Sequence, residues 1–403
     1  MSFERVCWTA IAVAAAWFGW SGLAHSATVG ASSCSLSDVQ AALNSARDGD
    51  TVTVPAGTCT WSGTLTLSRG LHLKGAGPSA TRVTVGGTIQ MSKHSSYHTA
   101  LSGFAFSKSG GGNSARILVV NGAWDGAPPL IFDNTFTLNG AGAIRYQTNG
   151  GVIYGNTFTG TWDESAILHK NDADRESWVT ADTFGVRDTT GTRNLYVEDN
   201  VFNNMPNQAT DFDDGSRVVF RRNTLNQSSF NSHGWATSPV GIRHFEIYDN
   251  TFRYSDTSVN QSWHIWIRGG TGVIHGNQIA NLVGQMWGDK QEIHFTIRGA
   301  EDARPQGSCG NVSYPVPRQL GQSHNGTRYV TDPIYMWGNS GTQAVSTGWN
   351  WGNPCGLSFS NFWQAGRDYV FGSPKPGYSP FVYPHPLRAG VVRPAPPSQM
   401  VVN

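Results

Sequence analysis

Short, strand-like segments of this 403-residue chain hold the residues whose types could do chemistry. Their second and fourth residues are mostly apolar, and the others are mostly polar. Because side chains alternate between the two faces of a strand, we expect the second and fourth to point inward and the first, third and fifth outward. The segments are 143–147, 166–170, 209–213, 229–233, 264–268 and 294–298.

If these segments stack, their outward residues form polar columns, with neighbours about 4.8 Å apart. The fifth residues are Gln147, Lys170, Asp213, His233, Arg268 and Arg298. The third residues are Arg145, Leu168, Asp211, Asn231, Trp266 and Thr296, and the first residues include His264 and His294. Such columns suit a groove for an acidic polysaccharide. The plainer interpretation is a solvated outer face, but charged residues make up only 14% of the chain and they gather here.

β-Elimination from a uronate is the first chemistry that these residues suggest. The sugar carboxylate must be neutralised by fixed cations, and a base must remove the neighbouring proton. Arg268 and Arg145 suit the first task, while His233 or Lys170 suits the second. We assign catalysis to His233, Asp213, Arg268 and Lys170. We assign substrate binding to Arg145, Asp211, Asn231, His264, Trp266, Arg298 and the loop residue Trp235.

Three carboxylates in four residues add a metal option, because Ca²⁺ takes oxygen ligands. They are Asp211, Asp213 and Asp214, and calcium is the one cofactor that we consider. The same residues support glycoside hydrolysis as the alternative. Inverting glycosidases use two carboxyl groups about 6.5–9.5 Å apart. Asp211 and Asp213 on one face of a strand meet that spacing. A non-catalytic polysaccharide-binding or adhesin protein is the third option.

A repeat runs through the middle of the chain and must position these residues. An apolar strand, an Asn turn and a second apolar pair recur around Asn134, Asn156, Asn200, Asn223, Asn250 and Asn277. The steps are 22, 44, 23, 27 and 27 residues, and the longest is one coil with an insertion. Strand repeats of this length without helices predict an all-β, single-stranded right-handed parallel β-helix, a solenoid whose asparagines stack.

The ends of the solenoid need caps. Residues 35–46 place Leu36, Val39, Ala42, Leu43 and Ala46 on one helical face, which predicts a short N-terminal capping helix. The proline-rich segment 374–386 is expected to lie extended across the last coils. We divide the chain into a signal peptide (1–26), one β-helix domain (27–390) and a mobile C-terminal tail (391–403).

The opening and the close of the chain carry a family resemblance. The sequence GDTVTVPAGTCTW at 49–61 and LHLKGAG at 71–77 resemble the start of many pectate-lyase-like β-helix proteins. The sequence GRDYVFGSPKPGYSPFVYPHPL at 366–387 resembles the end of a bacterial subgroup of that superfamily. The resemblance implies the fold; it leaves the chemistry open, because the superfamily contains lyases, hydrolases, epimerases and adhesins.

A second, partial resemblance bears on hydrolysis. The order Asp213-Asp214, His233-Gly234 and Arg268 resembles the polygalacturonase order of Asp-Asp, His-Gly and Arg-x-Lys. The Asn-Thr-Asp element of that family is missing, and the position two residues after Arg268 is not a lysine. Elimination therefore stays the first hypothesis.

Composition and cysteines indicate export. The net charge of +1 argues against a nucleic-acid binder, and an aromatic content of 11% argues against disorder. An apolar run at 6–23 before Ala24-His25-Ser26 predicts a secretory signal peptide, with a membrane anchor as the alternative. Without Cys7, four cysteines remain: Cys34, Cys59, Cys309 and Cys355. They allow three pairings, and closeness in the chain favours Cys34–Cys59 and Cys309–Cys355. We expect a secreted monomer without a nucleic-acid partner.

Overall fold

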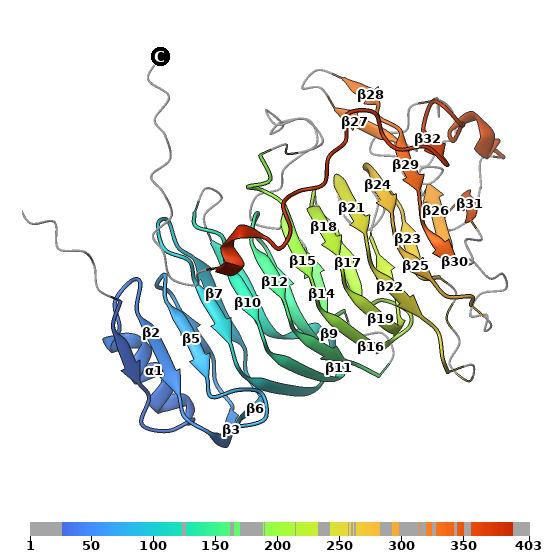
Figure 1. Ribbon diagram of the computed structural model, residues 1–403. Helices are drawn as coiled ribbons and strands as arrows, with labels where there is room; N and C mark the ends of the chain where they lie inside the picture. Colours follow the sequence, from blue (N-terminus) through green and yellow to red (C-terminus); the bar gives the residue numbers. More distant parts are fainter. Residues whose placement is uncertain are drawn as a thin grey trace, which may run out of the picture.

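The fold is built from parallel β-strands stacked in one direction, as Figure 1 shows for the computed structural model. The structure describes residues 26–122, 126–161, 165–169, 188, 190–213, 215–232, 242–256, 258, 261, 263–282, 292–297, 314, 320–324, 328–341, 345–349 and 356–389. The signal peptide and the tail after residue 390 lie outside this part, apart from Ser26. In the described part, no helix is long and apolar enough to cross a membrane.

The first ladder contains twelve hydrogen-bonded strands. In spatial order they are β1 (Thr28–Gly30), β2 (Thr51–Val54), β5 (His72–Gly75), β8 (Ala100–Ser102), β10 (Leu130–Phe132), β12 (Val152–Tyr154), β15 (Leu195–Glu198), β18 (Arg217–Arg221), β21 (His244–Tyr248), β24 (Thr271–His275), β29 (Ile334–Trp337) and β32 (Tyr369–Phe371).

The second ladder follows the Asn turns of successive coils. Its strands are β3 (Gly57–Trp61), β6 (Thr81–Val85), β9 (Ala105–Gly122), β11 (Thr135–Tyr146), β13 (Thr157–Thr159), β16 (Val201–Met205), β19 (Thr224–Ser228), β22 (Thr251–Arg253), β25 (Gln278–Ile279) and β30 (Ser340–Gly341).

The third ladder holds the segments that the sequence analysis singled out. It starts with β4 (Leu65–Leu67), β7 (Ile89–Lys93) and the second halves of β9 and β11. It continues with β14 (Ile167–His169), β17 (Thr210–Phe212), β20 (Phe230–Asn231), β23 (Ile265–Ile267), β26 (Ile293–Ile297) and β31 (Val345–Trp349). A parallel bridge from Phe212 to Ser232 joins β17 to β20. Outside the ladders, β27 (Gln322–His324) and β28 (Tyr329–Thr331) form an antiparallel pair.

Successive coils of the chain contribute a strand to each ladder in turn, and neighbouring strands of the ladders are parallel. The 44-residue step is a single coil, because β12 pairs directly with β15. The predicted parallel β architecture is confirmed in this respect, and it is consistent with a β-helix solenoid.

Seven buried or partly buried asparagines stack at the same turn of successive coils: Asn134, Asn156, Asn200, Asn223, Asn250, Asn277 and Asn339. The Nδ2 of each donates to the Oδ1 of the next at 2.8–3.1 Å. The predicted stack is confirmed, and Asn339 extends it. The left-handed residue is the one before each asparagine, with φ between 53° and 65°. The asparagine's task is therefore to satisfy amide groups that a turn would otherwise bury unpaired.

Aromatic rings fill the core between the ladders. Phe106, Phe136, Phe158, Phe202 and Phe220 lie on successive coils, with neighbouring ring centroids 4.9–5.8 Å apart. Such pairs contribute about 0.5–1.5 kcal/mol each beyond the burial of apolar area. Because no coil can bury its inner face alone, this packing couples each coil to its neighbours.

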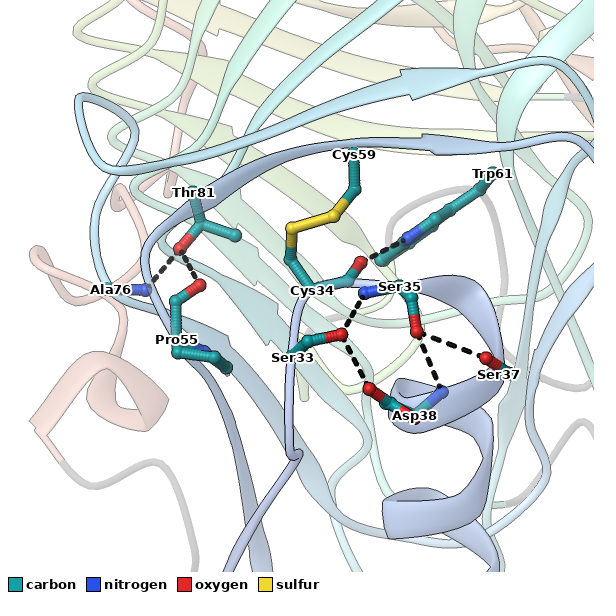
Figure 2. Close-up of a disulfide and its surroundings, with 10 residues drawn as sticks. All are labelled: Ser33, Cys34, Ser35, Ser37, Asp38, Pro55, Cys59, Trp61, Ala76 and Thr81. Atoms are coloured by element: carbon teal, nitrogen blue, oxygen red, sulfur yellow. Dashed lines mark hydrogen bonds between the residues drawn. A yellow bond between two sulfur atoms is a disulfide. The ribbon is translucent and has the colours of Figure 1, made fainter.

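The predicted capping helix is confirmed as α1 (Leu36–Ser45), which covers the N-terminal end of the core (Figure 1). Ser35 caps it by accepting a hydrogen bond from the Asp38 amide at 3.2 Å. Figure 2 shows the Cys34–Cys59 disulfide that joins this cap to β3. The Trp61 indole donates to the Cys34 carbonyl at 2.9 Å. By its loop length, the disulfide stabilises the fold by about 3 kcal/mol. Cys309 and Cys355 lie outside the described residues.

The segment 374–389, here called the C-terminal strap, runs back across the first ladder, as the red trace in Figure 1 shows. Lys375 pairs with Asp332 near the end of the stack at 2.9 Å. Arg388 reaches Glu198 at 3.1 Å and lies over the Tyr154 ring, in the middle coils. The strap therefore extends well beyond the last coils, where we expected it.

Candidate active site

The inward residues of the third ladder lie as predicted. Residues such as Ile144, Phe212, Ile265 and Phe295 are fully buried in the core. His169 is 2% exposed between the rings of Tyr146 and Phe212. Burial lowers its pKa to about 3, so it stays neutral at ordinary pH. It is a core histidine, as its fourth place in the segment 166–170 predicts.

The register confirms four of the five predicted steps along the columns. Arg145 pairs with Leu168, Leu168 with Asp211, and Asn231 with Trp266. The Phe212–Ser232 bridge sets Asp211 beside Asn231, which is the fourth step. The last step is wrong by two residues, because Trp266 pairs with His294. This moves His294 from the first place into the third-place column. Thr296 then occupies the position beside Arg268 that we had assigned to Arg298.

The first residues of the segments do not face outward, so the expectation that His264 faces outward to bind substrate is corrected. Ala143, Ala166, Ala209, Ser229 and His264 are all fully buried. The His264 ring contacts the Ala280 carbonyl at 3.0 Å and the Gln261 side chain at 3.2 Å. Burial lowers the pKa of His264 to about 4. This histidine supports the fold behind the surface, and no substrate reaches it as it lies.

Arg268, Trp266 and His294 form the best-defined group on the outward face. The Arg268 guanidinium lies 4.1 Å from the Trp266 ring centroid. Its Nε donates to the Ser232 carbonyl at 2.7 Å and its Nη2 to the Asn231 Oδ1 at 3.2 Å. These contacts fix the guanidinium in place. Asn231, which is 1% exposed, thus positions Arg268 rather than presenting its own side chain.

His294 lies beside this cation and is partly exposed. Its ring centroid is 5.7 Å from that of Trp266, and its Nδ1 contacts the Ser346 hydroxyl at 2.7 Å. Burial, with a contribution from Arg268, lowers its pKa to about 4. At neutral pH the imidazole is therefore uncharged and one ring nitrogen holds a lone pair that can accept a proton. The Trp266 indole donates to the Thr296 hydroxyl at 2.9 Å, which holds the ring in place.

Asp211 and Asp213 lie next along the stack, in and directly after β17. They are 7% and 3% exposed. The Asp213 amide donates to the His169 carbonyl at 2.9 Å, so the backbone there is fixed to the coil below. Among the described residues, no group of three or more His, Cys, Asp and Glu side chains could hold a metal ion. Two carboxylates supply part of the six to eight oxygens of a calcium site, and the calcium site stays a prediction.

Arg116, in β9, belongs to this face and was not predicted. It is 4% exposed, and its guanidinium lies against Gly142, where a Cβ atom would meet its Nη1. Burial, then the charge of Arg145, lowers its pKa to about 10, and Asp211 acts in the opposite direction. Its Nε and Nη1 have no hydrogen-bond partner in the described structure. With half-buried Arg145, it adds positive charge to the face.

The sequence held one signal for Arg116. The segment 117–121 aligns with 143–147, because Leu118 and Val120 pair with Ile144 and Tyr146, and Arg116 comes directly before it. Its coil precedes the first Asn turn of the repeat, so the alignment began one coil too late.

Several predicted site residues lie outside the described part of the chain. They are Lys170, Asp214, His233, Trp235 and Arg298. Their roles stay predictions. Of the other predicted residues, Arg145, Asp211, Asp213, Asn231, Trp266 and Arg268 share the outward side of the third ladder.

The charges of Arg217, Arg221 and Arg222, in and directly after β18, predict a solvated face, and the structure shows that this prediction is wrong. Arg221 is fully buried and Arg217 is 3% exposed. Only Arg222 is exposed, and it pairs with Asp249 at 3.2 Å. The strap covers Arg221, since its guanidinium donates to the Phe381 and Val382 carbonyls at 2.8 Å.

Comparison with known proteins gives similarity of overall structure only. No protein-family model matches the chain, and no curated protein matches it in sequence. A solved alginate lyase from Paenibacillus sp. str. FPU-7 is similar at 10% identity and a TM-score of 0.45, over 80% of this chain and 98% of that one. The catalytic domain of a GH87 alpha-1,3-glucanase with nigerose is similar at 11% identity and a TM-score of 0.32, over 86% and 68%. At these scores neither similarity bears on the activity of this chain.

Proposed function

We propose that the protein is an exported, right-handed parallel β-helix of the pectate-lyase-like type that cleaves a uronate-containing polysaccharide by β-elimination. One observation carries the proposal. A fixed guanidinium, an indole and a neutral imidazole lie together on adjacent strands of the third ladder, in Arg268, Trp266 and His294. Arginine pairs with carboxylates, and aromatic faces pack on sugar rings.

The fold supports this proposal in two ways. Parallel strands joined by crossovers are right-handed in nearly all known cases, which favours a right-handed coil. The Cys34–Cys59 disulfide fits an oxidising compartment. With the predicted signal peptide, these features favour secretion, and we expect the enzyme to act as a monomer.

The chemistry follows from the charges. Arg268 holds the uronate carboxylate and stabilises the negative charge that spreads onto it as the C5 proton leaves. Arg145, four strands away along the third ladder, binds another part of the polyuronate. We assign the base to His294 among the described residues: with its Nδ1 donating to the Ser346 hydroxyl, its Nε2 accepts that proton. The electron pair then forms the C4–C5 double bond as the C4–O bond breaks, and the leaving oxygen takes up a proton. His233 and Lys170 are the alternative bases.

Absorbance of the mature protein with a panel of polyuronates, with and without calcium, tests the reaction. We expect the ultraviolet absorbance of a conjugated double bond to rise together with reducing ends. His294→Gln should lower kcat by about 10²–10⁴-fold, the range for loss of general base catalysis. His275→Gln is the matched control, since His275 stacks between Tyr248 and Trp337 at the first ladder. Full activity of His294→Gln with loss in His233→Ala or Lys170→Ala would move the base to that residue.

Hydrolysis is the second candidate, supported by the placement of Asp211 and Asp213 two residues apart at the outward side of one strand. Such positions are about 6–7 Å apart along a strand, close to the separation of inverting glycosidases. New reducing ends without absorbance, abolished by Asp213→Asn, would establish this mechanism. If neither absorbance nor reducing ends rise while the sugar still binds, the protein would instead be a binding protein.

A further inference from the structure

A cavity of about 340 Å³ lies between the first ladder and the C-terminal strap, away from the third ladder. Its volume is within the range of small-molecule sites, which begins at roughly 300 Å³. The first ladder and its neighbouring loop contribute His98, Asn194 and Tyr196. The strap contributes Phe381, His385 and Leu387. The strap therefore completes the cavity as well as covering the sheet.

The lining of this cavity is uncharged. Its described residues include no Asp, Glu, Lys or Arg. Burial lowers the pKa of His98, and burial lowers that of His385 to about 4, so both rings are neutral at pH 7. The ionic groups whose charges act on His385 belong to one another, since Glu198 bonds Arg221 and Arg388. A charged ligand would find no counter-ion here, which excludes a uronate as the natural occupant.

The walls combine aromatic faces with neutral polar groups. The Tyr196 ring centroid lies 4.3 Å from that of His385 and 5.8 Å from that of Phe381. Asn194 is fully buried with its amide beside the Tyr196 hydroxyl, and its amide oxygen has no hydrogen-bond partner within the described residues. His98 Nδ1 donates to the Pro128 carbonyl at 2.8 Å, which leaves its Nε2 as an acceptor.

We propose that this cavity binds a neutral glycosyl residue, at a site separate from the candidate active site. Aromatic faces suit the apolar side of a sugar ring, while the amide of Asn194 and the imidazole of His98 suit its hydroxyls. The choice of a sugar over another neutral ring rests on the proposed function. The site would hold an uncharged part of the polysaccharide while the third ladder acts on a uronate.

Binding of neutral sugars, measured without turnover, tests the site. We would titrate the mature protein with the methyl glycosides of glucose, galactose, mannose and xylose, by saturation-transfer NMR and calorimetry. Galacturonate and glucuronate are the charged counterparts. At least one neutral glycoside should bind, and Asn194→Leu should weaken it at least tenfold. Thr192→Trp, which adds bulk at an exposed position of the rim, should abolish it with an unchanged melting temperature. Thr137→Trp, at an exposed position of β11, is the matched control.

Three results would overturn the proposal. The first is equal binding to Thr192→Trp and to the unchanged protein. The second is binding of uronates alone. The third is binding that appears only after residues 390–403 are removed, which would mean that the cavity serves the end of the chain. His294→Gln separates the two proposals, because it should stop turnover and leave neutral-sugar binding intact.

Discussion

Two buried arginines of this protein, Arg221 on the first ladder and Arg116 on the third, differ in how their charges are satisfied. On the first ladder, Arg221 bonds Glu198, Tyr248 and two carbonyls of the strap, all at 2.7–2.9 Å. On the third ladder, Arg116 is equally buried, but two of its nitrogens have no partner in the described structure. Burying charge without full pairing costs free energy, so a protein keeps such a group where it has another use. Arg221 is therefore structural, and Arg116 is the residue to test for function.

Removing Arg221 from its buried ion pair on the first ladder should have the largest effect on stability. Arg221→Met removes one partner of a fully buried ion pair and leaves the Glu198 carboxylate with fewer donors. We expect the free energy of unfolding to fall by about 3–5 kcal/mol, because an uncompensated charge stays buried. Chemical denaturation measures this change. Turnover per folded molecule should stay the same, and a loss of turnover without a loss of stability would contradict the structural role.

Low pH should destabilise the fold through His264, which is buried behind the third ladder. The pKa of His264 is lowered to about 4 in the folded protein, whereas an unfolded histidine titrates near 6.5. Between these values only the unfolded chain takes up the proton, so stability is lost as the pH falls below about 6.5. From pH 7 to 5, this one residue should lower the free energy of unfolding by roughly 2 kcal/mol. Denaturation of His264→Gln at both pH values checks it; an unchanged pH dependence in that variant would contradict the assignment.

Replacing Arg116 on the third ladder by Met should have the smallest effect on stability. Arg116→Met removes a desolvated cation, so we expect the free energy of unfolding to stay within about 1 kcal/mol or to rise. On a polyuronate, kcat/KM should fall at least tenfold, or about 1.4 kcal/mol. Arg116→Lys, which keeps the charge, should restore part of that loss. A large loss of stability in Arg116→Met would contradict this difference between Arg221 and Arg116.

The sequence predicted the features that depend on neighbouring coils and missed those that depend on distant ones. The asparagine stack and the inward residues of the third ladder recur with the repeat, so they could be found. The cover over Arg221 comes from a segment 160 residues away, and its own strand gives no sign of it. The sequence alignment placed His294 in the wrong register for another reason. A shift of two residues keeps Ile293, Phe295 and Ile297 on the same face, so the apolar pattern fits both alignments.

The strap also sets an order of assembly. The coils depend on contacts between neighbouring turns of the chain, whereas Arg388 meets Glu198 across 190 residues of sequence. During synthesis the coils can therefore close one after another, and the strap can dock only after residues 374–389 have been made. Until then the strap does not cover Glu198, Arg221 and Glu246, which it contacts in the folded protein. Charged side chains on an open sheet face disfavour aggregation, so we expect these residues to help the sheet stay soluble before the strap docks.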